Sequence, residues 1–292
     1  MTKINNTFDV EKHIHSRALK HEAANIHSKV YPGLATIELN VTELCNRTCS
    51  FCPRHDPEVY PNQKLFMDLK LVEKLTDELI SSDWKGDIHI TGFGEPHTHP
   101  LLIDIVTILR RHQGLSIEIT TNGDRIVDSH PELAMCLWDA GLDLLTVDCY
   151  DGEDQYNTRH TVLEVIGPHK KWRLRQHYDT GNTQELILQY GFNNRGGTMG
   201  GEGIQNACYL PFYKAFIDWN GSVNLCCNDW HREAGSFGNI LDSSFSEIWT
   251  SERMNRVRAS LGKGIRKGVC ANCNIVGTKF SKASYEILLP SL

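Results

Sequence analysis

This 292-residue sequence lacks three features that define other classes of protein. No apolar run approaches the roughly 18 residues of a membrane-spanning helix. Its first residues, "MTKINNTFDVEKHIHS", contain neither the apolar segment nor the cleavage site of a secretory signal peptide. Basic residues are not in excess, because the formal net charge is -6. We therefore expect a cytoplasmic protein with no membrane or nucleic-acid partner, whose basic runs "HKKWRLR" and "RKG" are solvated faces.

Cysteine, by contrast, is plentiful. The chain has ten cysteines, and Cys45, Cys49 and Cys52 lie close together in "CNRTCSFC". In a reducing compartment such a group indicates a metal site rather than disulfides. A zinc ion would take His55 as a fourth ligand in a structural site. An iron–sulfur cluster held by three thiolates would instead leave one iron open for a reactant.

Short segments rich in isoleucine, valine and leucine alternate with segments of helical periodicity in the first half of the chain. This alternation predicts an α/β fold with a parallel sheet. Strands are predicted at 35–40, 87–91, 115–121 and 143–148, and helices at 68–81, 100–112, 131–140 and 153–167.

The predicted strands carry polar residues at alternate positions, which is unusual for parallel strands covered by helices on both faces. The period of two places Glu38, His89, Glu118 and Asp148 on one face. A filled barrel packs branched apolar side chains inside, so a polar lumen favours a partial (β/α) TIM-like barrel of about five or six strands around a polar ligand. An open sheet with one solvated face is the alternative.

Glycine-containing motifs follow the second and third strands, at the strand ends where parallel sheets bind ligands. In "GFGEPHTHP", Gly92 and Gly94 allow the backbone to approach a ligand closely, and Pro96 stiffens the exit. The third strand runs into "TTNGD". We expect His97 and His99 to face solvent and assign them no role.

The rest of the chain carries further signals. The segments "KWRLRQHYD" and "QELILQYGF" lie too close together for a crossover helix, so they form an antiparallel hairpin or the end of a truncated barrel. "YLPFYKAFIDWNGSVNLCC" predicts two strands joined by a type I′ turn at Asn220-Gly221, and residues 238–262 predict a helix. Four cysteines here can hold either a cluster or a zinc ion: Cys208, Cys226, Cys270 and Cys273.

The motifs of the first half resemble those of the radical S-adenosylmethionine (SAM) superfamily. C-x3-C-x2-C with Phe51 before its last cysteine resembles the cluster motif. "FGEP" resembles the Gly-Gly-Glu-Pro motif, with Phe93 replacing the first glycine, and "TTNG" resembles the ribose-contacting position. The resemblance implies a [4Fe–4S] cluster on Cys45, Cys49 and Cys52, and a SAM site that includes Phe51, Gly94, Glu95, Pro96, Thr120, Asn122 and Asp148.

The spacing C-x12-G-x4-C, then a helix, then C-x2-C resembles the short twitch form of the SPASM extension. This resemblance implies an auxiliary [4Fe–4S] cluster on Cys208, Cys226, Cys270 and Cys273. We expect an N-terminal extension at 1–33, a radical SAM partial barrel at 34–200, and a small iron–sulfur domain of a β-hairpin and a helix at 201–292. The layout is similar to that of radical SAM dehydrogenases of aminocyclitols and epimerases of aminoglycosides.

The superfamily cleaves SAM to a 5′-deoxyadenosyl radical that removes hydrogen from a substrate carbon, which leaves three classes of reaction open. A dehydrogenase would pass an electron to the auxiliary cluster, and an epimerase would return hydrogen from a thiol. A peptide-modifying enzyme is disfavoured, because the segment before the first strand is too short for an added peptide-binding domain. The expected partners are an amino sugar, an aminocyclitol or a short peptide, and an electron donor of the flavodoxin or ferredoxin type.

Three further residues receive predictions. Arg195, in "GFNNRGG", is placed to contact the substrate, with an ordinary salt bridge as the alternative. Successive strand side chains point to opposite faces, so only one of Cys226 and Cys227 can bind the auxiliary cluster, and G-x4-C selects Cys226. Cys227 then either packs as a small apolar residue or faces the barrel as a hydrogen donor. Cys136 is predicted to be a core residue.

Overall fold

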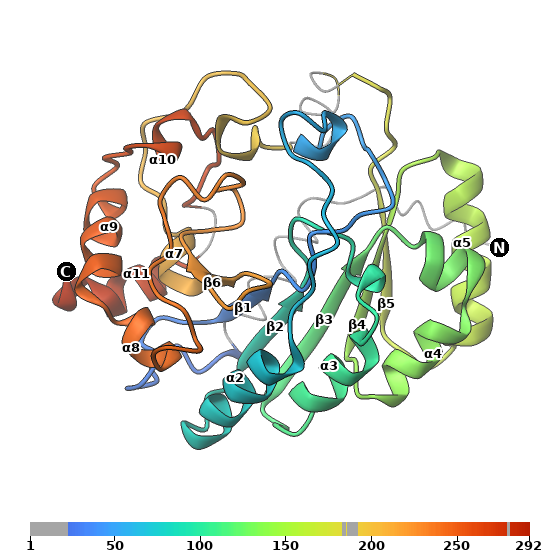
Figure 1. Cartoon of the computed structure of the whole chain (residues 1–292), viewed down its shortest axis with the longest axis horizontal. Helices are drawn as coiled ribbons and strands as arrows, with labels where there is room; N and C mark the ends of the chain where they lie inside the picture. The colour runs from blue at the N-terminus through green and yellow to red at the C-terminus, as the bar shows by residue number, and fades with distance from the viewer. Residues whose placement is uncertain (1–22, 183–184, 186–191, 279–280) are drawn as a thin grey trace.

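The computed structural model describes residues 23–182, 185, 192–278 and 281–292. Within these residues one open sheet has the strand order β5-β4-β3-β2-β1-β6-β7. All neighbouring strands are parallel except β6 and β7, which are antiparallel (Figure 1). This α/β arrangement confirms the predicted fold class. The strands are β1 (Thr36–Leu39), β2 (Gly86–Ile90), β3 (Leu115–Thr121), β4 (Leu144–Cys149), β5 (Trp172–Gln176), β6 (Lys214–Ile217) and β7 (Val223–Asn224).

Helices α2 to α5 connect the first five strands and lie along one side of the sheet, whereas α7 to α11 lie beyond β1 (Figure 1). Short 3-10 and π segments occur in the loops: η1 (Pro53–His55), η2 (Pro96–Thr98), η3 (Asp124–Ser129), η4 (Arg195–Gly197) and η5 (Leu289–Ser291). The helices are α2 (Leu69–Ser81), α3 (Leu102–Leu109), α4 (Glu132–Asp139), α5 (Glu153–Ile166), α7 (Leu210–Tyr213), α8 (Phe245–Trp249), α9 (Glu252–Gly262), α10 (Val269–Asn272) and α11 (Lys282–Leu288).

The two faces of the sheet differ as the alternation predicted. Ile37, Ile88 and Ile117 are register partners on adjacent strands, and all three are fully buried in the main hydrophobic core. Burying each such side chain contributes about 1.5–3 kcal/mol. Glu38 pairs in register with His89, and His89 with Glu118, so these polar side chains share the opposite face. The sheet therefore has one apolar face and one polar face.

Strand β6 pairs with β1, although the two strands lie far apart in the sequence. Thr36 is the register partner of Lys214, and Leu39 that of Ile217. The expected domain boundary at residue 200 therefore lies in the sequence between β5 and β6, two strands of the same sheet.

The predicted hairpin is present and consists of β6 and β7, but the predicted type I′ turn is wrong. The amide of Gly221 donates to the carbonyl of Asp218 at 2.8 Å, and that of Asp218 donates to the carbonyl of Ser222 at 2.9 Å. Between Asp218 and Ser222 only Gly221 has a positive φ, +84°, which fits a type I turn with a G1 bulge.

The helix predicted at 238–262 begins late and is divided. Residues before Ser244 form turns, and Ser244 caps α8 in a capping box with Glu247. Ser251 then caps the separate helix α9. The core placement of Cys136 is also wrong, because this residue of α4 is exposed. The proposed strand "QELILQYGF" lies largely outside the described residues. No helix in the described ranges is long and apolar enough to cross a membrane.

Candidate active site

Cys45, Cys49 and Cys52 lie on the loop that leaves the carboxyl end of β1. The amide of Cys45 donates to Asn62 Oδ1 at 2.9 Å, and Asn62 Nδ2 donates to the Cys45 carbonyl at 2.7 Å. The amide of Cys52 donates to the carbonyl of Cys49 at 3.0 Å. These bonds fold the cysteine motif against the segment that precedes α2.

Burial disfavours free thiolates on this loop. It raises the pKa of Cys45 to about 12, with a further contribution from the charge of Glu95. Burial also raises the pKa of Cys49, and the neighbouring Cys52 and Cys45 add to the effect. A cationic cluster would remove this penalty, since a metal stabilises the thiolate form of its ligands. The donor set therefore fits an iron–sulfur cluster.

The zinc alternative receives no support from the geometry. His55 is exposed, and its Nδ1 lies 3.1 Å from the carbonyl of Thr48. In the described ranges, no three histidine, cysteine, aspartate or glutamate side chains are grouped as ligands of a single metal ion. A four-iron cluster spreads its ligands over separate irons, so it suits thiols that are held apart.

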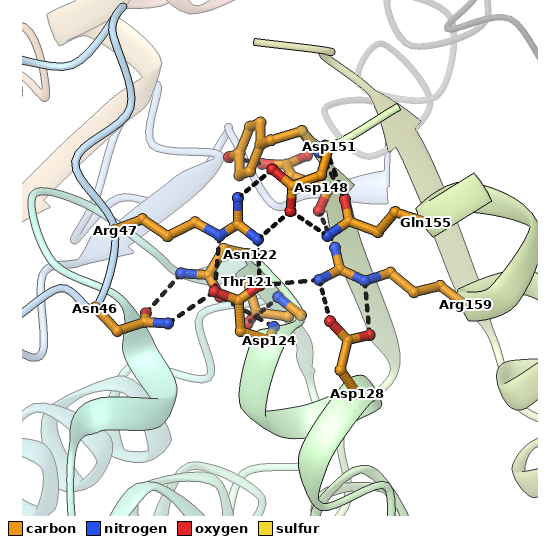
Figure 2. Close-up of polar contacts among 12 residues, drawn as sticks. Asn46, Arg47, Thr121, Asn122, Asp124, Asp128, Asp148, Asp151, Gln155 and Arg159 are labelled. Carbon is orange, nitrogen blue, oxygen red and sulfur yellow. Dashed lines mark hydrogen bonds and ion pairs between the residues drawn. The ribbon is translucent and has the colours of Figure 1, made fainter. Parts of the chain in front are cut away.

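A network of arginines and carboxylates ties the cysteine loop to the ends of β3 and β4 (Figure 2). Arg47 lies between Cys45 and Cys49 in the sequence, and its guanidinium bridges Asp124 at 2.6 Å and Asp151 at 2.6 Å. The buried Arg159 of α5 binds Asp124 at 3.0 Å from the other side. Sequence reasoning missed this network, because the partners of Arg47 belong to distant parts of the sequence.

The "FGEP" segment is hydrogen-bonded to the "TTNG" segment, so the two predicted SAM-binding loops meet. Glu95 Oε1 accepts from the hydroxyl of Thr121 at 2.7 Å, and Oε2 accepts from the amide of Asn122 at 2.7 Å. A Cβ on Gly94 would overlap the carbonyl of Thr42, so only glycine fits there. Pro96 opens η2 and is buried.

The two histidines of this loop contradict the expectation of solvent exposure. His97 is 7% exposed and its Nδ1 lies 2.8 Å from Glu95 Oε1. His99 is 3% exposed and its Nε2 lies 2.9 Å from the carbonyl of Met67. Both rings find polar partners inside the loop, which makes their burial tolerable. His97 thus helps to orient Glu95.

Other predicted SAM-site residues lie around the same loops. Phe51 stacks on Phe192, with ring centroids 4.6 Å apart, and approaches Tyr150 at 5.5 Å. Asn122 Nδ2 donates to Asn46 Oδ1 at 2.8 Å, beside Arg47. Thr120 Oγ1 lies deeper, 2.8 Å from His89 Nε2.

The polar face of the sheet is lined by ion pairs that join neighbouring strands. Lys214 of β6 donates to Glu38 at 2.6 Å, and Arg173 of β5 donates to Glu118 at 2.8 Å. Arg175 binds Asp148 with Nε at 2.5 Å and Nη2 at 2.8 Å. The basic run "HKKWRLR" is therefore not a solvated face throughout. Its alternation R-x-R is the signal that could have placed both arginines inside.

Two titratable groups at the end of this face have shifted pKa values. Burial alone would raise the pKa of Asp148, but Arg175 and His177 outweigh it, so the pKa lies below its ordinary value. Burial lowers the pKa of His177 to about 4, against the opposing pull of Asp148. At neutral pH this face therefore presents a carboxylate and a neutral imidazole side by side.

Arg195 lies at the junction of the two predicted domains. Burial raises the pKa values of Cys52 and Cys227 and lowers that of His177, and the charge of Arg195 acts on all three, so they lie within its electrostatic reach. Its backbone has a φ of +51°, a strained conformation for a residue with a side chain. In the described part of the chain its guanidinium has no carboxylate partner, and its Nε is buried without a hydrogen bond. The guanidinium lies over the ring of Phe192, 5.7 Å from its centroid.

The second cysteine set converges on one largely apolar pocket. The thiols Cys208, Cys226, Cys270 and Cys273 all line it, together with Leu210, Pro211, Leu225, Leu261, Arg266 and Ile275. Burial raises the pKa of Cys270 to about 12 and that of Cys226 far above its ordinary value. Four cysteine ligands would close a cluster with no open position, and the apolar wall would keep water away. The residues present fit an auxiliary cluster.

Cys227 faces away from that pocket. It packs beside the aromatic cluster of Tyr60, Phe93, Phe216 and Trp230, which also contacts Cys52. Burial raises the pKa of Cys227 to about 12, and Glu38, Lys214 and Arg195 act on its charge. The thiol is therefore on the polar-face side of the sheet, whereas Cys226 lines the other pocket. The expected strand placement of the two cysteines is wrong, because β7 ends at Asn224 and both follow it.

Comparisons with known proteins agree with this division of the chain. A model of the radical SAM superfamily matches residues 39–180, and a model of the iron-sulfur cluster-binding SPASM domain matches residues 208–274. The S-adenosyl-L-methionine-dependent 2-deoxy-scyllo-inosamine dehydrogenase of Niallia circulans is 27% identical, over 87% of this chain and 97% of that protein. The tungsten-containing aldehyde ferredoxin oxidoreductase cofactor-modifying protein of Pyrococcus furiosus is 30% identical, over 81% of this chain and 86% of that protein.

A solved structure agrees as well. The crystal structure of BtrN in complex with AdoMet and 2-DOIA matches with a TM-score of 0.71 at 25% identity, covering 85% of this chain and 96% of that one. The matched domains imply SAM with a [4Fe–4S] cluster, and an additional iron–sulfur cluster in the SPASM domain. On these grounds, the chain belongs to the radical SAM superfamily and carries a C-terminal SPASM-type iron–sulfur domain.

Proposed function

We propose that this enzyme is a radical SAM dehydrogenase that oxidises a hydroxyl-bearing carbon of an amino sugar or aminocyclitol. When bound, SAM and its cluster supply a 5′-deoxyadenosyl radical, and the auxiliary cluster supplies an electron acceptor. The substrate carbon loses a hydrogen atom to the radical, its hydroxyl loses a proton, and one electron leaves. The product is a ketone that is two hydrogens lighter than the substrate.

The observation that carries this proposal is the four-cysteine pocket. A cluster held by Cys208, Cys226, Cys270 and Cys273 would have no free iron to bind substrate, so electron transfer is the role left to it. The dehydrogenase relative from Niallia circulans and the BtrN complex support the same reaction and the aminocyclitol class.

The chain's own residues would bind and orient the substrate on the polar face. Glu38 and Lys214 offer a hydrogen-bond acceptor and donors 2.6 Å apart, which suits neighbouring hydroxyl and amino groups. We assign to the Glu38 carboxylate the acceptance of the hydroxyl proton, and to Arg195 a direct contact with a substrate oxygen. Phe51 and the loop network around Arg47 would hold SAM above this face.

The test is anaerobic turnover of the reconstituted enzyme with SAM, a reductant and a panel of aminocyclitols, amino sugars and short peptides. We expect a product two mass units lighter than an aminocyclitol or amino sugar, with 5′-deoxyadenosine formed in step with it. Products from peptides alone would reject the substrate class.

Epimerisation is a second candidate because Cys227 lies near Glu38, Lys214 and Arg195 rather than in the auxiliary pocket. Its thiol could return a hydrogen atom to the opposite face of the substrate radical, and the sulfur radical left behind would regain the thiol by taking one electron from the reductant and one proton from water. In that case the product would keep the substrate's mass in ordinary water and would gain one deuterium at carbon in D2O. Loss of that product in Cys227→Ala would establish epimerisation over oxidation.

A further inference from the structure

A charged network with buried carboxylates joins the loop of Cys45, Cys49 and Cys52, called here the SAM-cluster loop, to the segment that follows Cys226, called here the auxiliary-cluster segment. Arg232 donates through Nη2 to Glu43 Oε1 and through Nε to Asp218 Oδ2, the latter at 2.7 Å. Glu43 closely precedes Cys45 in the sequence, and Arg232 closely follows Cys226. One guanidinium therefore links the segments that carry the two cysteine sites through side chains other than the cysteines themselves.

Glu43 also connects both sides of the first cysteine motif. Its Oε2 accepts from Arg54 Nη2 at 2.7 Å and from the hydroxyl of Tyr60 at 2.9 Å. Arg54 comes just after Cys52 in the sequence, and its Nε donates to the carbonyl of Phe93 at 2.5 Å. The carboxylate is thus the common anchor of the cysteine loop and the neighbouring "FGEP" loop.

Aromatic side chains pack on this network and leave the Arg232 side chain 28% exposed. The guanidinium of Arg232 lies 4.9 Å from the ring centroid of Phe93, and that of Arg54 lies 4.8 Å from the ring of Tyr60. Trp230 packs on Phe93 at 4.4 Å. The aromatic cluster of Tyr60, Phe93, Phe216 and Trp230 contacts Cys52 of the first cysteine set and Cys227, the neighbour of Cys226.

Stability is a poor explanation for this arrangement. Glu43, Arg54 and Asp218 are 3%, 3% and 2% exposed, and buried ion pairs are often no more stabilising than apolar residues of the same volume. Arg232 also has a φ of +53°, a conformation that costs about 1–3 kcal/mol in a residue other than glycine. What the network does provide is a fixed geometry between two segments, since each partner has several directed bonds.

We propose that Arg232 and Glu43 form a clasp that fixes the auxiliary-cluster segment against the SAM-cluster loop, and that Arg232 is a positioning residue for electron transfer. In the oxidation proposed above, on which this role rests, the substrate radical must lose its electron before it is quenched. A displaced auxiliary segment would slow that loss, while SAM cleavage at the other cluster would continue.

The test uses the anaerobically reconstituted holoenzyme and two variants, Arg232→Met and Arg232→Lys. Arg232→Met keeps the length without the charge, and Arg232→Lys keeps the charge without the fork that binds two carboxylates. Arg256→Met is the matched control, because Arg256 is exposed and pairs with Glu252 on the same helix. Iron content, 5′-deoxyadenosine per product, and hydrogen exchange of residues 45–54 are measured for each.

We expect both Arg232 variants to raise the ratio of 5′-deoxyadenosine to product by about tenfold, because even a small misplacement of the reacting groups slows a reaction strongly. Hydrogen exchange should rise in 45–54 and not in α3 or α4. Arg256→Met should change neither quantity. If Arg232→Met does not retain iron, the proposal is tested on Arg232→Lys alone, by the same product ratio and the same hydrogen exchange.

Two results would overturn the clasp. One is an unchanged ratio in an Arg232 variant that retains full iron. The other is unchanged exchange in 45–54, which needs no substrate and so stands even if dehydrogenation proves wrong. Conversely, increased exchange together with an isomeric product would keep the clasp as a structural link and reject the oxidation.

Discussion

The loop of Cys45, Cys49 and Cys52 is held by charged side chains, whereas the pocket of the other four cysteines is walled mainly by leucine, proline and isoleucine. Arg47 of the first loop pairs with Asp124 and Asp151, which lie on other loops at the strand ends. The cysteines of the second site come from neighbouring segments of one region of the chain, including α10 and the end of the β6–β7 hairpin. The surroundings of the first site are therefore polar, and those of the second are mainly apolar.

This difference follows from what each cluster would need. A cluster that binds SAM must leave room for a charged amino acid and a ribose, so polar groups at strand ends are suitable neighbours. A cluster that only exchanges electrons gains from a dry surrounding, which controls its potential and protects it. The structure keeps the two environments apart but joins their backbones through β6, which pairs with β1.

The largest effects should come from removing Cys45, Cys49 and Cys52. We call their site the open site, because a cluster held by three cysteines would keep one iron free for a reactant. With two clusters, the unchanged holoenzyme should contain about eight irons per chain. Replacing Cys45, Cys49 and Cys52 together with alanine should halve the iron and abolish 5′-deoxyadenosine formation, as measured by iron assay and chromatography. Stoichiometric zinc without iron in anaerobically isolated protein would contradict both cluster assignments.

The four-cysteine pocket, called the closed site because four cysteines would leave no iron free, allows a comparison between the adjacent residues Cys226 and Cys227. Cys226→Ala should lose the auxiliary iron and the product, because Cys226 lines the four-cysteine pocket. Cys227→Ala should keep all the iron, since Cys227 packs against the aromatic cluster and does not line that pocket. Both variants are compared by iron assay and by electron paramagnetic resonance spectroscopy. Iron loss in Cys227→Ala and not in Cys226→Ala would reverse the assignment.

Much of the open site could be predicted because its signals are local. Period-2 alternation placed Glu38, His89 and Glu118 on one face, and the motifs fell at successive strand ends as expected. What could not be predicted depends on distant partners. The pairing of β6 with β1 and the contact of Glu43 with Arg232 leave no periodic trace, because each joins segments from opposite ends of the chain.

Smaller errors had local causes. The turn at Asn220-Gly221 permits more than one hairpin, and the three-residue loop formed because Asp218, rather than Trp219, closes it. We expect His97 and His99 to face solvent because they lie in a polar loop. Each instead found a buried acceptor, Glu95 Oε1 for His97 and the Met67 carbonyl for His99.

A smaller effect should follow from loosening the open loop without removing a ligand. Arg47→Met removes the bonds to Asp124 and Asp151 but leaves the three thiols. We expect full iron and a rate of 5′-deoxyadenosine formation about tenfold lower, because loop position matters for reaction geometry. Exposed Arg256→Met is the control. Loss of the first cluster's iron would show that Arg47 is needed for assembly instead.

The smallest effect concerns how pH acts on the polar face, where His177 is 5% exposed. Burial lowers its pKa from 6.5 to about 4, so between these values the unfolded chain binds a proton that the folded chain does not. Stability must therefore fall as the pH falls through this range, by about 2 kcal/mol at pH 5 relative to pH 7.5 from this group. His177→Gln cannot titrate, so its unfolding midpoint should fall less than that of the unchanged holoenzyme between pH 7.5 and pH 5. Among the described residues, none that lines the apolar pocket is a histidine, so Leu225→Ala should lower the midpoint equally at both pH values. An identical pH dependence in His177→Gln and the unchanged enzyme would show that His177 is not the group through which acid acts.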